Sequence, residues 1–159
     1  MNNLIAQIKT VLGVDNPEPK SKTKDTEKKG IVIDIEQQTK DNVYFRRVLY
    51  TAEHMQLVFM SLKPGEDIGM ESHDVDQFFR IEQGTGQVTI NGTKAGVKDG
   101  SAIIVPAGAE HNVLNTGDED LKIYTIYAKP HHQDGTIRGT KEDAEDPKNK
   151  EEFDGKITE

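Results

Sequence analysis

The spacing of apolar residues divides the chain into parts of different character. Near the N-terminus, five apolar residues recur with a helical period, which predicts a short amphipathic helix over residues 1–14. Residues 15–30 contain no large apolar side chain, and residues 141–159 contain only Phe153 and Ile157. Such segments bury too little surface to offset the entropy of ordering them, so we expect a flexible linker and a flexible acidic tail. The helix-forming residues are Leu4, Ile5, Ile8, Val11 and Leu12.

Between residues 31 and 128 the apolar period changes to two, which is typical of half-buried strands. The segments are short, rich in β-branched and aromatic residues, and separated by turn signals, of which Asn91-Gly92 is the clearest hairpin. Strands this closely spaced predict one all-β domain over residues 31–140, a closed or double-sheet antiparallel fold. The candidate strands are Ile31–Ile35, Val43–Thr51, Met55–Lys63, Gln77–Glu82, Gln87–Ile90, Ala102–Val105, His111–Asn115 and Leu121–Tyr127.

The composition narrows the classes of function. The chain has 20 basic and 28 acidic residues and a net charge of −8, and this acidic balance argues against a nucleic-acid partner. The chain has no cysteine, which excludes disulfides, thiolate metal sites and iron–sulfur clusters. No apolar run is long enough to span a membrane, and the first residues do not resemble a signal peptide. We therefore expect a cytoplasmic protein that does not bind membranes.

Two histidines, His73 and His111, lie beside turns at the ends of predicted strands. Along an extended chain Glu71, His73 and Gln77 differ by even numbers and project to the same face. If that face meets His111, two imidazoles, a carboxylate and an amide carbonyl converge, a set that suits a borderline divalent ion rather than Ca²⁺ or Mg²⁺. The same residue types also fit a solvated turn and an ordinary strand, so spacing alone leaves both interpretations open.

Two stretches of the chain carry a specific resemblance. Residues 100–115 resemble the second motif of the cupin superfamily, G-x5-P-x-G-x2-H-x3-N, at every fixed position. Residues 65–84 are similar to the first cupin motif, G-x5-H-x-H-x3-E-x6-G, with both glycines and one histidine in place. Glu71 stands where this motif has its first histidine, and Gln77 stands where it has its glutamate. The matched residues of the second motif are Gly100, Pro106, Gly108, His111 and Asn115.

The resemblance implies a double-stranded β-helix barrel, the cupin or jelly-roll fold, that holds one metal ion. It implies Glu71, His73, Gln77 and His111 as the metal ligands. The two exchanges leave two imidazoles and one carboxylate in the set, so the charge of the ligands is kept. We therefore expect a bound Mn, Fe, Co, Ni or Zn ion, with the neutral Gln77 as its weakest ligand.

Cupins differ widely in function, so the resemblance leaves three functions open. The first is a metal-dependent enzyme on a small sugar-like or carbonyl-containing molecule, similar to one-domain sugar-phosphate isomerases; no residue stands out as its base, and the catalytic residues stay unassigned. The second is an Fe(II)-dependent dioxygenase, and the third is a non-catalytic cupin that binds or senses a sugar or an anion. Because cupins pair through edge strands, we also expect a homodimer, formed by Ile31–Ile35 and Val43–Thr51.

Two further features have alternative interpretations. Arg46, Arg47 and Arg80 fit either an anionic group of a substrate or pairing with surface acids. Residues 130–136, which include two consecutive histidines, fit either a lid over the barrel mouth or an unstructured exit from the last strand. Neither feature by itself decides between the three functions.

Overall fold

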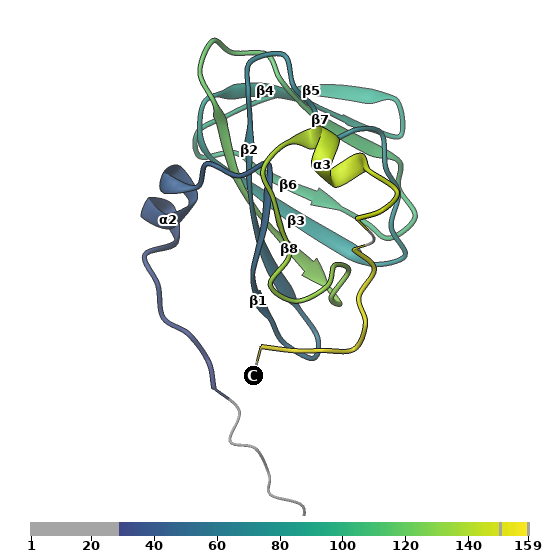
Figure 1. The fold of residues 1–159 in the computed structure, drawn as a ribbon. Helices are drawn as coiled ribbons and strands as arrows, with labels where there is room; N and C mark the ends of the chain where they lie inside the picture. Colours follow the sequence, from purple (N-terminus) through teal and green to yellow (C-terminus); the bar gives the residue numbers. More distant parts are fainter. Residues whose placement is uncertain (1–28, 150, 159) are drawn as a thin grey trace, which may run out of the picture.

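The computed structural model describes residues 29–149 and 151–158, and the helix predicted over residues 1–14 and most of the linker 15–30 lie outside them. Two antiparallel sheets form the barrel, with strand orders β6-β3-β8-β2-β1-β9 and β5-β4-β7 (Figure 1). The predicted all-β, double-sheet barrel is therefore confirmed. The strands are β1 (Arg46–Thr51), β2 (Gln56–Leu62), β3 (Asp76–Gln83), β4 (Thr85–Ile90), β5 (Thr93–Lys98), β6 (Ala102–Val105), β7 (His111–Asn115), β8 (Leu121–Ala128) and β9 (Ile137–Arg138).

The inward faces of the two sheets meet in a single apolar core. Phe79 and Ile81 of β3 are fully buried, and Val113 of β7 joins them from the smaller sheet. β2 lies between β1 and β8 and is buried along its whole length. Burial of this kind is the main favourable term in folding, and it fixes the strands that carry the candidate site residues.

The hairpin predicted at Asn91-Gly92 joins β4 to β5. Asn91 has a φ of 46° and Gly92 a φ of 79°, and a type I′ turn needs positive φ at both central positions. The flanking residues Ile90 and Thr93 pair across the turn. This hairpin places β5 at the edge of the smaller sheet, where Val97 is its one buried residue.

The strand predicted for Ile31–Ile35 is wrong. The described residues 29–34 form no strand, and α2 (Ile35–Asp41) begins where the strand was expected to end. The Asp34 carboxylate accepts a hydrogen bond of 3.0 Å from the Gln37 backbone N–H, and this N-cap starts the helix. Val32 is fully exposed, so the apolar alternation at this point does not correspond to a buried face. Among the described residues, no helix has the length and apolar character needed to cross a membrane.

The structure also differs from the sequence prediction after residue 140. Residues 141–149 and 151–158, here called the C-terminal segment, begin with α3 (Lys141–Glu145) and then run along the barrel (Figure 1). The Phe153 backbone N–H donates to the His131 carbonyl at 3.0 Å, and the Thr158 N–H donates to the Thr51 carbonyl at 2.8 Å. Backbone hydrogen bonds and ion pairs hold this segment, and a count of apolar residues does not detect either.

The close packing around Gly86, between β7 of its own sheet and Leu121 of the other sheet, generates a test of the fold. A Cβ at Gly86 would lie 2.6 Å from the Leu114 carbonyl oxygen and 3.0 Å from Leu121 Cδ2. We expect Gly86→Ala to lower the free energy of unfolding by about 1–3 kcal/mol, measured by urea denaturation. Gly96→Ala on β5 is the matched control, because no atom lies within 4 Å of its added Cβ. Equal losses in the two variants would contradict this packing.

Candidate metal centre

One loop and the start of one strand bring the candidate ligands together. Glu71 and His73 lie in the loop between β2 and β3, and His111 is the first residue of β7. The backbone N–H of Glu71 donates to the carbonyl of His111, and the N–H of His111 donates back to Glu71, both at 2.9 Å. The Gly108 N–H donates to the His73 carbonyl at 2.7 Å. The loop is therefore joined to the start of β7 by backbone bonds on both sides of the site.

The side chains of these three residues converge on one point. Glu71 Oε1 lies 3.1 Å from His73 Nε2 and 3.5 Å from His111 Nε2. One donor atom from each of the three residues lies within 4.8 Å of the other two. His111 Nδ1 lies 3.0 Å from the carbonyl oxygen of Ala109, which only accepts, so Nδ1 carries the proton of the neutral ring. The Nε2 lone pair of His111 is then free for a metal ion.

Gln77, the fourth predicted ligand, lies in the same interior on β3. Its Nε2 donates to the Thr125 hydroxyl at 3.1 Å, which orients the amide. The Gln77 side chain also interacts with Tyr127, whose ring packs edge-on against His73 with 5.6 Å between centroids. The structure therefore brings Glu71, His73 and His111 together, and Gln77 is linked to them through Tyr127.

Three buried polar atoms of the candidate ligands are available to an ion. Nε2 of His73, Nε2 of His111 and Oε1 of Gln77 make no hydrogen bond of acceptable geometry within the described part of the chain. Buried polar atoms in folded proteins almost always have a partner. Two imidazole nitrogens, an amide oxygen and the Glu71 carboxylate are donors that a borderline divalent ion accepts. The residues thus fit the metal that the fold implies.

The electrostatics of the cluster favour a positive charge at its centre. Burial alone would raise the pKa of Glu71, but His111, His73 and Arg46 outweigh it and lower the pKa to about 2. Burial lowers the pKa of His111, but the contacts with Glu71 and the Ala109 carbonyl outweigh it, and the net shift is upward. Glu71 is therefore an ionised carboxylate at neutral pH. A divalent ion would place positive charge beside this carboxylate.

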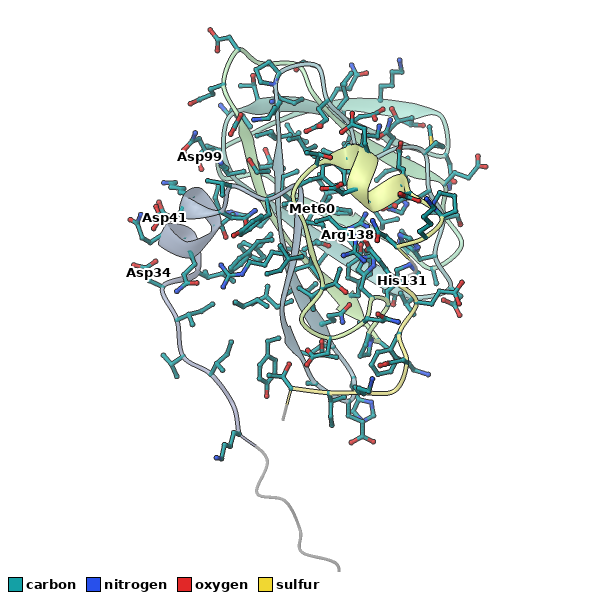
Figure 2. All side chains as sticks on the ribbon, viewed as in Figure 1. Asp34, Asp41, Met60, Asp99, His131 and Arg138 are labelled. Carbon is teal, nitrogen blue, oxygen red and sulfur yellow. The ribbon has the colours of Figure 1, made fainter. Side chains whose placement is uncertain are left out.

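A cavity of about 300 Å³ lies beside Glu71 and His73. The segment that follows β8 forms part of its wall, where the His131 ring lies 4.1 Å from the His73 ring between centroids. Gln56 fixes this wall, because its side chain accepts from the His132 N–H at 2.9 Å and donates to the His132 carbonyl at 2.8 Å. Of residues 130–136, His131 and His132 thus line the cavity (His131 is labelled in Figure 2).

Sequence reasoning missed a second buried carboxylate at this cavity. Glu151 of the C-terminal segment has a side chain 8% exposed. Its Oε2 accepts a hydrogen bond of 2.8 Å from Arg46 Nη1 and lies 3.3 Å from His132 Nδ1, while its Oε1 lies 2.7 Å from Arg138 Nε (labelled in Figure 2). Arg46 is therefore already paired with an acid. Nothing in the sequence distinguishes Glu151 from the solvated acids around it, because its burial depends on backbone pairing with residues 131–133.

The other two candidate arginines do not reach the cavity. Arg80 lies with its Nε 3.5 Å from Glu82 Oε1, and neither Arg80 nor Arg47 lines the cavity. The side chains that do line it are those of Phe45, Arg46, Ile68, Glu71, His73, His131, His132, Ala144, Glu145, Asn149, Glu151 and Glu152.

Known proteins resemble this chain both in sequence and in structure. Residues 58–127 match the sequence family described as "Cupin domain". The chain is 51% identical to the uncharacterized protein YrkC of Bacillus subtilis in an alignment of 128 residues that covers 76% of this chain and 69% of that protein. It is 45% identical to the uncharacterized protein L612 of Acanthamoeba polyphaga mimivirus over 67% of this chain and 69% of that protein. The crystal structure of BH2720 from Bacillus halodurans has 45% identity and a TM-score of 0.72, over 76% of this chain and 96% of that one.

The buried Glu151 carboxylate generates a prediction about pH. Burial alone would raise its pKa, but His132 and Arg46 lower it from 4.5 to about 2. A depressed carboxyl pKa contributes stability that is present above the unfolded value and is lost as the pH falls through the folded value. In metal-free protein, Glu151→Gln should therefore lower the free energy of unfolding most at pH 6–7, and this deficit should shrink as the pH falls from about 4.5 toward 2.

Urea denaturation across this pH range measures the deficit. The exposed neighbour Glu152→Gln is the matched control and should change the free energy at pH 7 by less than about 0.5 kcal/mol. A deficit of Glu151→Gln that stays constant from pH 7 to pH 3 would contradict the ion pairs described for Glu151.

Proposed function

The chain belongs to the cupin superfamily, and we propose that it is a metal-dependent enzyme acting on a small molecule that carries carbonyl or hydroxyl oxygens. One observation carries this proposal. The buried Nε2 atoms of His73 and His111, which have no hydrogen-bond partner in the described part of the chain, lie with the ionised Glu71 beside a cavity. A cavity of about 300 Å³ is at the small end of the range for ligand pockets, which favours a substrate of few atoms.

Each residue of the centre has a distinct role in this proposal. Glu71, His73 and His111 would hold the ion, and Gln77 would supply a neutral fourth donor. The set fits Mn, Fe, Co, Ni or Zn. When bound, such an ion polarises a carbonyl oxygen or binds two oxygens of a substrate.

Isomerisation is the first candidate reaction, and His131 supports it. An aldose–ketose isomerase needs a base that moves a proton between neighbouring carbons. The His131 ring lies 4.1 Å from the His73 ring between centroids and lines the cavity. Burial, followed by the charges of His132 and His73, lowers the pKa of His131 to about 4. His131 is therefore neutral at pH 7 and able to accept a proton.

An Fe(II)-dependent dioxygenase is the second candidate, and the ligand set favours it. Two histidines and one carboxylate with open positions are the donors of the facial triad in non-haem Fe(II) oxygenases. Glu71, His73 and His111 supply this set. A non-catalytic cupin would bind metal and ligand in the same place without turnover.

A homodimer and a cytoplasmic location remain proposals for the whole protein. The first two residues of β1, Arg46 and Arg47, already pair with β9, so this part of β1 is not open to a partner strand. Exposed apolar side chains before β1 support a dimer contact at that part of the surface: Ile31 (47%), Val32 (102%) and Val43 (72%). A mass of about 18 kDa by light scattering, that of one chain, would exclude the dimer.

The metal site is tested by metal content. Protein loaded with Mn²⁺, Fe²⁺ or Zn²⁺ and then desalted should hold about one ion per chain, measured by plasma mass spectrometry. His73→Ala, His111→Ala and Glu71→Ala should each lose most of this metal, because each removes one of few protein donors. His54→Ala is the matched control, because the His54 side chain is 80% exposed and lies outside the cluster. Full metal content in His111→Ala would refute the site.

Turnover assays separate the two candidate reactions. The Mn²⁺ or Zn²⁺ form should interconvert aldose and ketose sugars if the protein is an isomerase, and His131→Asn should then lower kcat by about 10²–10⁴ with little change in metal content. Oxygen uptake that requires Fe²⁺ and persists in His131→Asn would support the dioxygenase. Ligand-induced thermal stabilisation without turnover in any metal form would contradict both enzymes.

A further inference from the structure

The cavity beside the metal centre has two walls of different charge. The barrel contributes one arginine, Arg46, and one carboxylate, Glu71, together with the histidines. The C-terminal segment contributes three carboxylates and no basic residue to the lining. These three are Glu145, Glu151 and Glu152. The segment therefore makes the cavity more acidic than the barrel alone would be.

The one lining arginine is not available to a ligand. Arg46 is 8% exposed, and its Nη1 donates to Glu151 Oε2 at 2.8 Å. The other oxygen of the same carboxylate, Oε1, lies 2.7 Å from Arg138 Nε. Guanidinium groups arranged around both oxygens of a carboxylate are the usual way in which proteins bind small carboxylates and phosphates. Glu151 occupies the place that an anionic group of a ligand would take.

Glu151 is held in this place by its backbone as well as by its charge. The Gln133 N–H donates to the Glu151 carbonyl at 2.7 Å, and the Phe153 N–H donates to the His131 carbonyl at 3.0 Å. The carboxylate is thus tethered to its site, and a free anion must compete with a high effective concentration. An anion that does not displace Glu151 meets Glu145 and Glu152 on the same wall, and like charges at short range disfavour binding.

From these observations we propose that the C-terminal segment is the specificity element of the pocket. Glu151 fills an anion subsite formed by Arg46 and Arg138. With this subsite filled, the pocket accepts uncharged or cationic polar molecules and rejects anions. If the substrate is a sugar, the pocket binds the free sugar and excludes the corresponding sugar phosphate. The selection of the substrate rests on the proposed function, whereas the anion subsite is independent of any metal.

The subsite is tested in metal-free protein by chemical rescue. Glu151→Ala leaves space at the two arginines, and sodium formate should enter it and raise the thermal unfolding midpoint by several degrees more than sodium chloride at the same ionic strength. Wild-type protein should not distinguish the two salts. Glu151→Gln is the matched control, because it removes the same charge but keeps the space filled, and it should not respond. The double variant Glu151→Ala/Arg46→Met should lose the response.

The selectivity of the pocket is tested in cobalt-loaded protein by visible absorption. Azide, an anion, and imidazole, at a pH where it is neutral, both bind open positions on cobalt. Relative to wild type, Glu151→Ala should bind azide at least about tenfold more tightly and imidazole within about twofold. Glu142→Ala is the control, since Glu142 lies on α3 but does not line this cavity.

The outcomes distinguish the two proposals. A formate response equal in wild type, Glu151→Gln and Glu151→Ala would overturn the anion subsite. Failure of cobalt to bind would refute the metal site but leave the rescue result decisive for the subsite. Unchanged azide affinity in a cobalt-loaded Glu151→Ala protein would overturn the role of the segment in selectivity.

Discussion

The candidate site depends on the two backbone hydrogen bonds that join Glu71 to His111. Each is 2.9 Å long, and together they attach the loop before β3 to the first residue of β7. Every other relation in the centre follows from this attachment, because it places a carboxylate and an imidazole from distant parts of the chain on facing backbones. Backbone bonds of this kind do not require a particular side chain. That explains how glutamate can stand where the cupin motif has histidine without loss of the site's geometry.

Two buried carboxylates of the cavity differ in what neutralises them. Glu71 lies between two imidazoles, whose unprotonated nitrogens can bind a metal ion. Glu151 lies between Arg46, Arg138 and His132, and the two arginines keep their protons at all accessible pH values. Among the described residues, Glu71 is the one of these two carboxylates that lies with two imidazoles in a cluster that could hold a metal ion. Glu71 thus belongs to a candidate metal site on the barrel, whereas Glu151 belongs to an ion-pair network that holds the C-terminal segment. Arg46 contributes to both, because its charge lowers the pKa of Glu71 and that of Glu151.

The sequence predicts the core strands of the barrel correctly, but it does not predict residues 31–35 or the C-terminal segment that lines the cavity. The period-two alternation identifies the strands of the core, and Asn91-Gly92 identifies a hairpin because only certain residues tolerate positive φ. Ile31–Ile35 shows the same alternation but forms no strand, since strand formation depends on a partner that local sequence does not reveal. The burial of Glu151 likewise depends on pairing with residues before β9, so composition alone marks it as a solvated acid. The proximity of Glu71, His73 and His111 was predictable from the cupin motifs, whereas the roles of His131 and Arg46 required the fold.

The most direct test of the account is a crystal structure of the protein grown with Mn²⁺, with anomalous scattering used to locate the ion. We expect one strong anomalous peak among Glu71 Oε1, His73 Nε2 and His111 Nε2, within coordination distance of each, with Gln77 as a further or water-mediated ligand. A peak at His131 and His132 instead, or no peak while these three side chains keep the arrangement described here, would contradict the proposed metal centre.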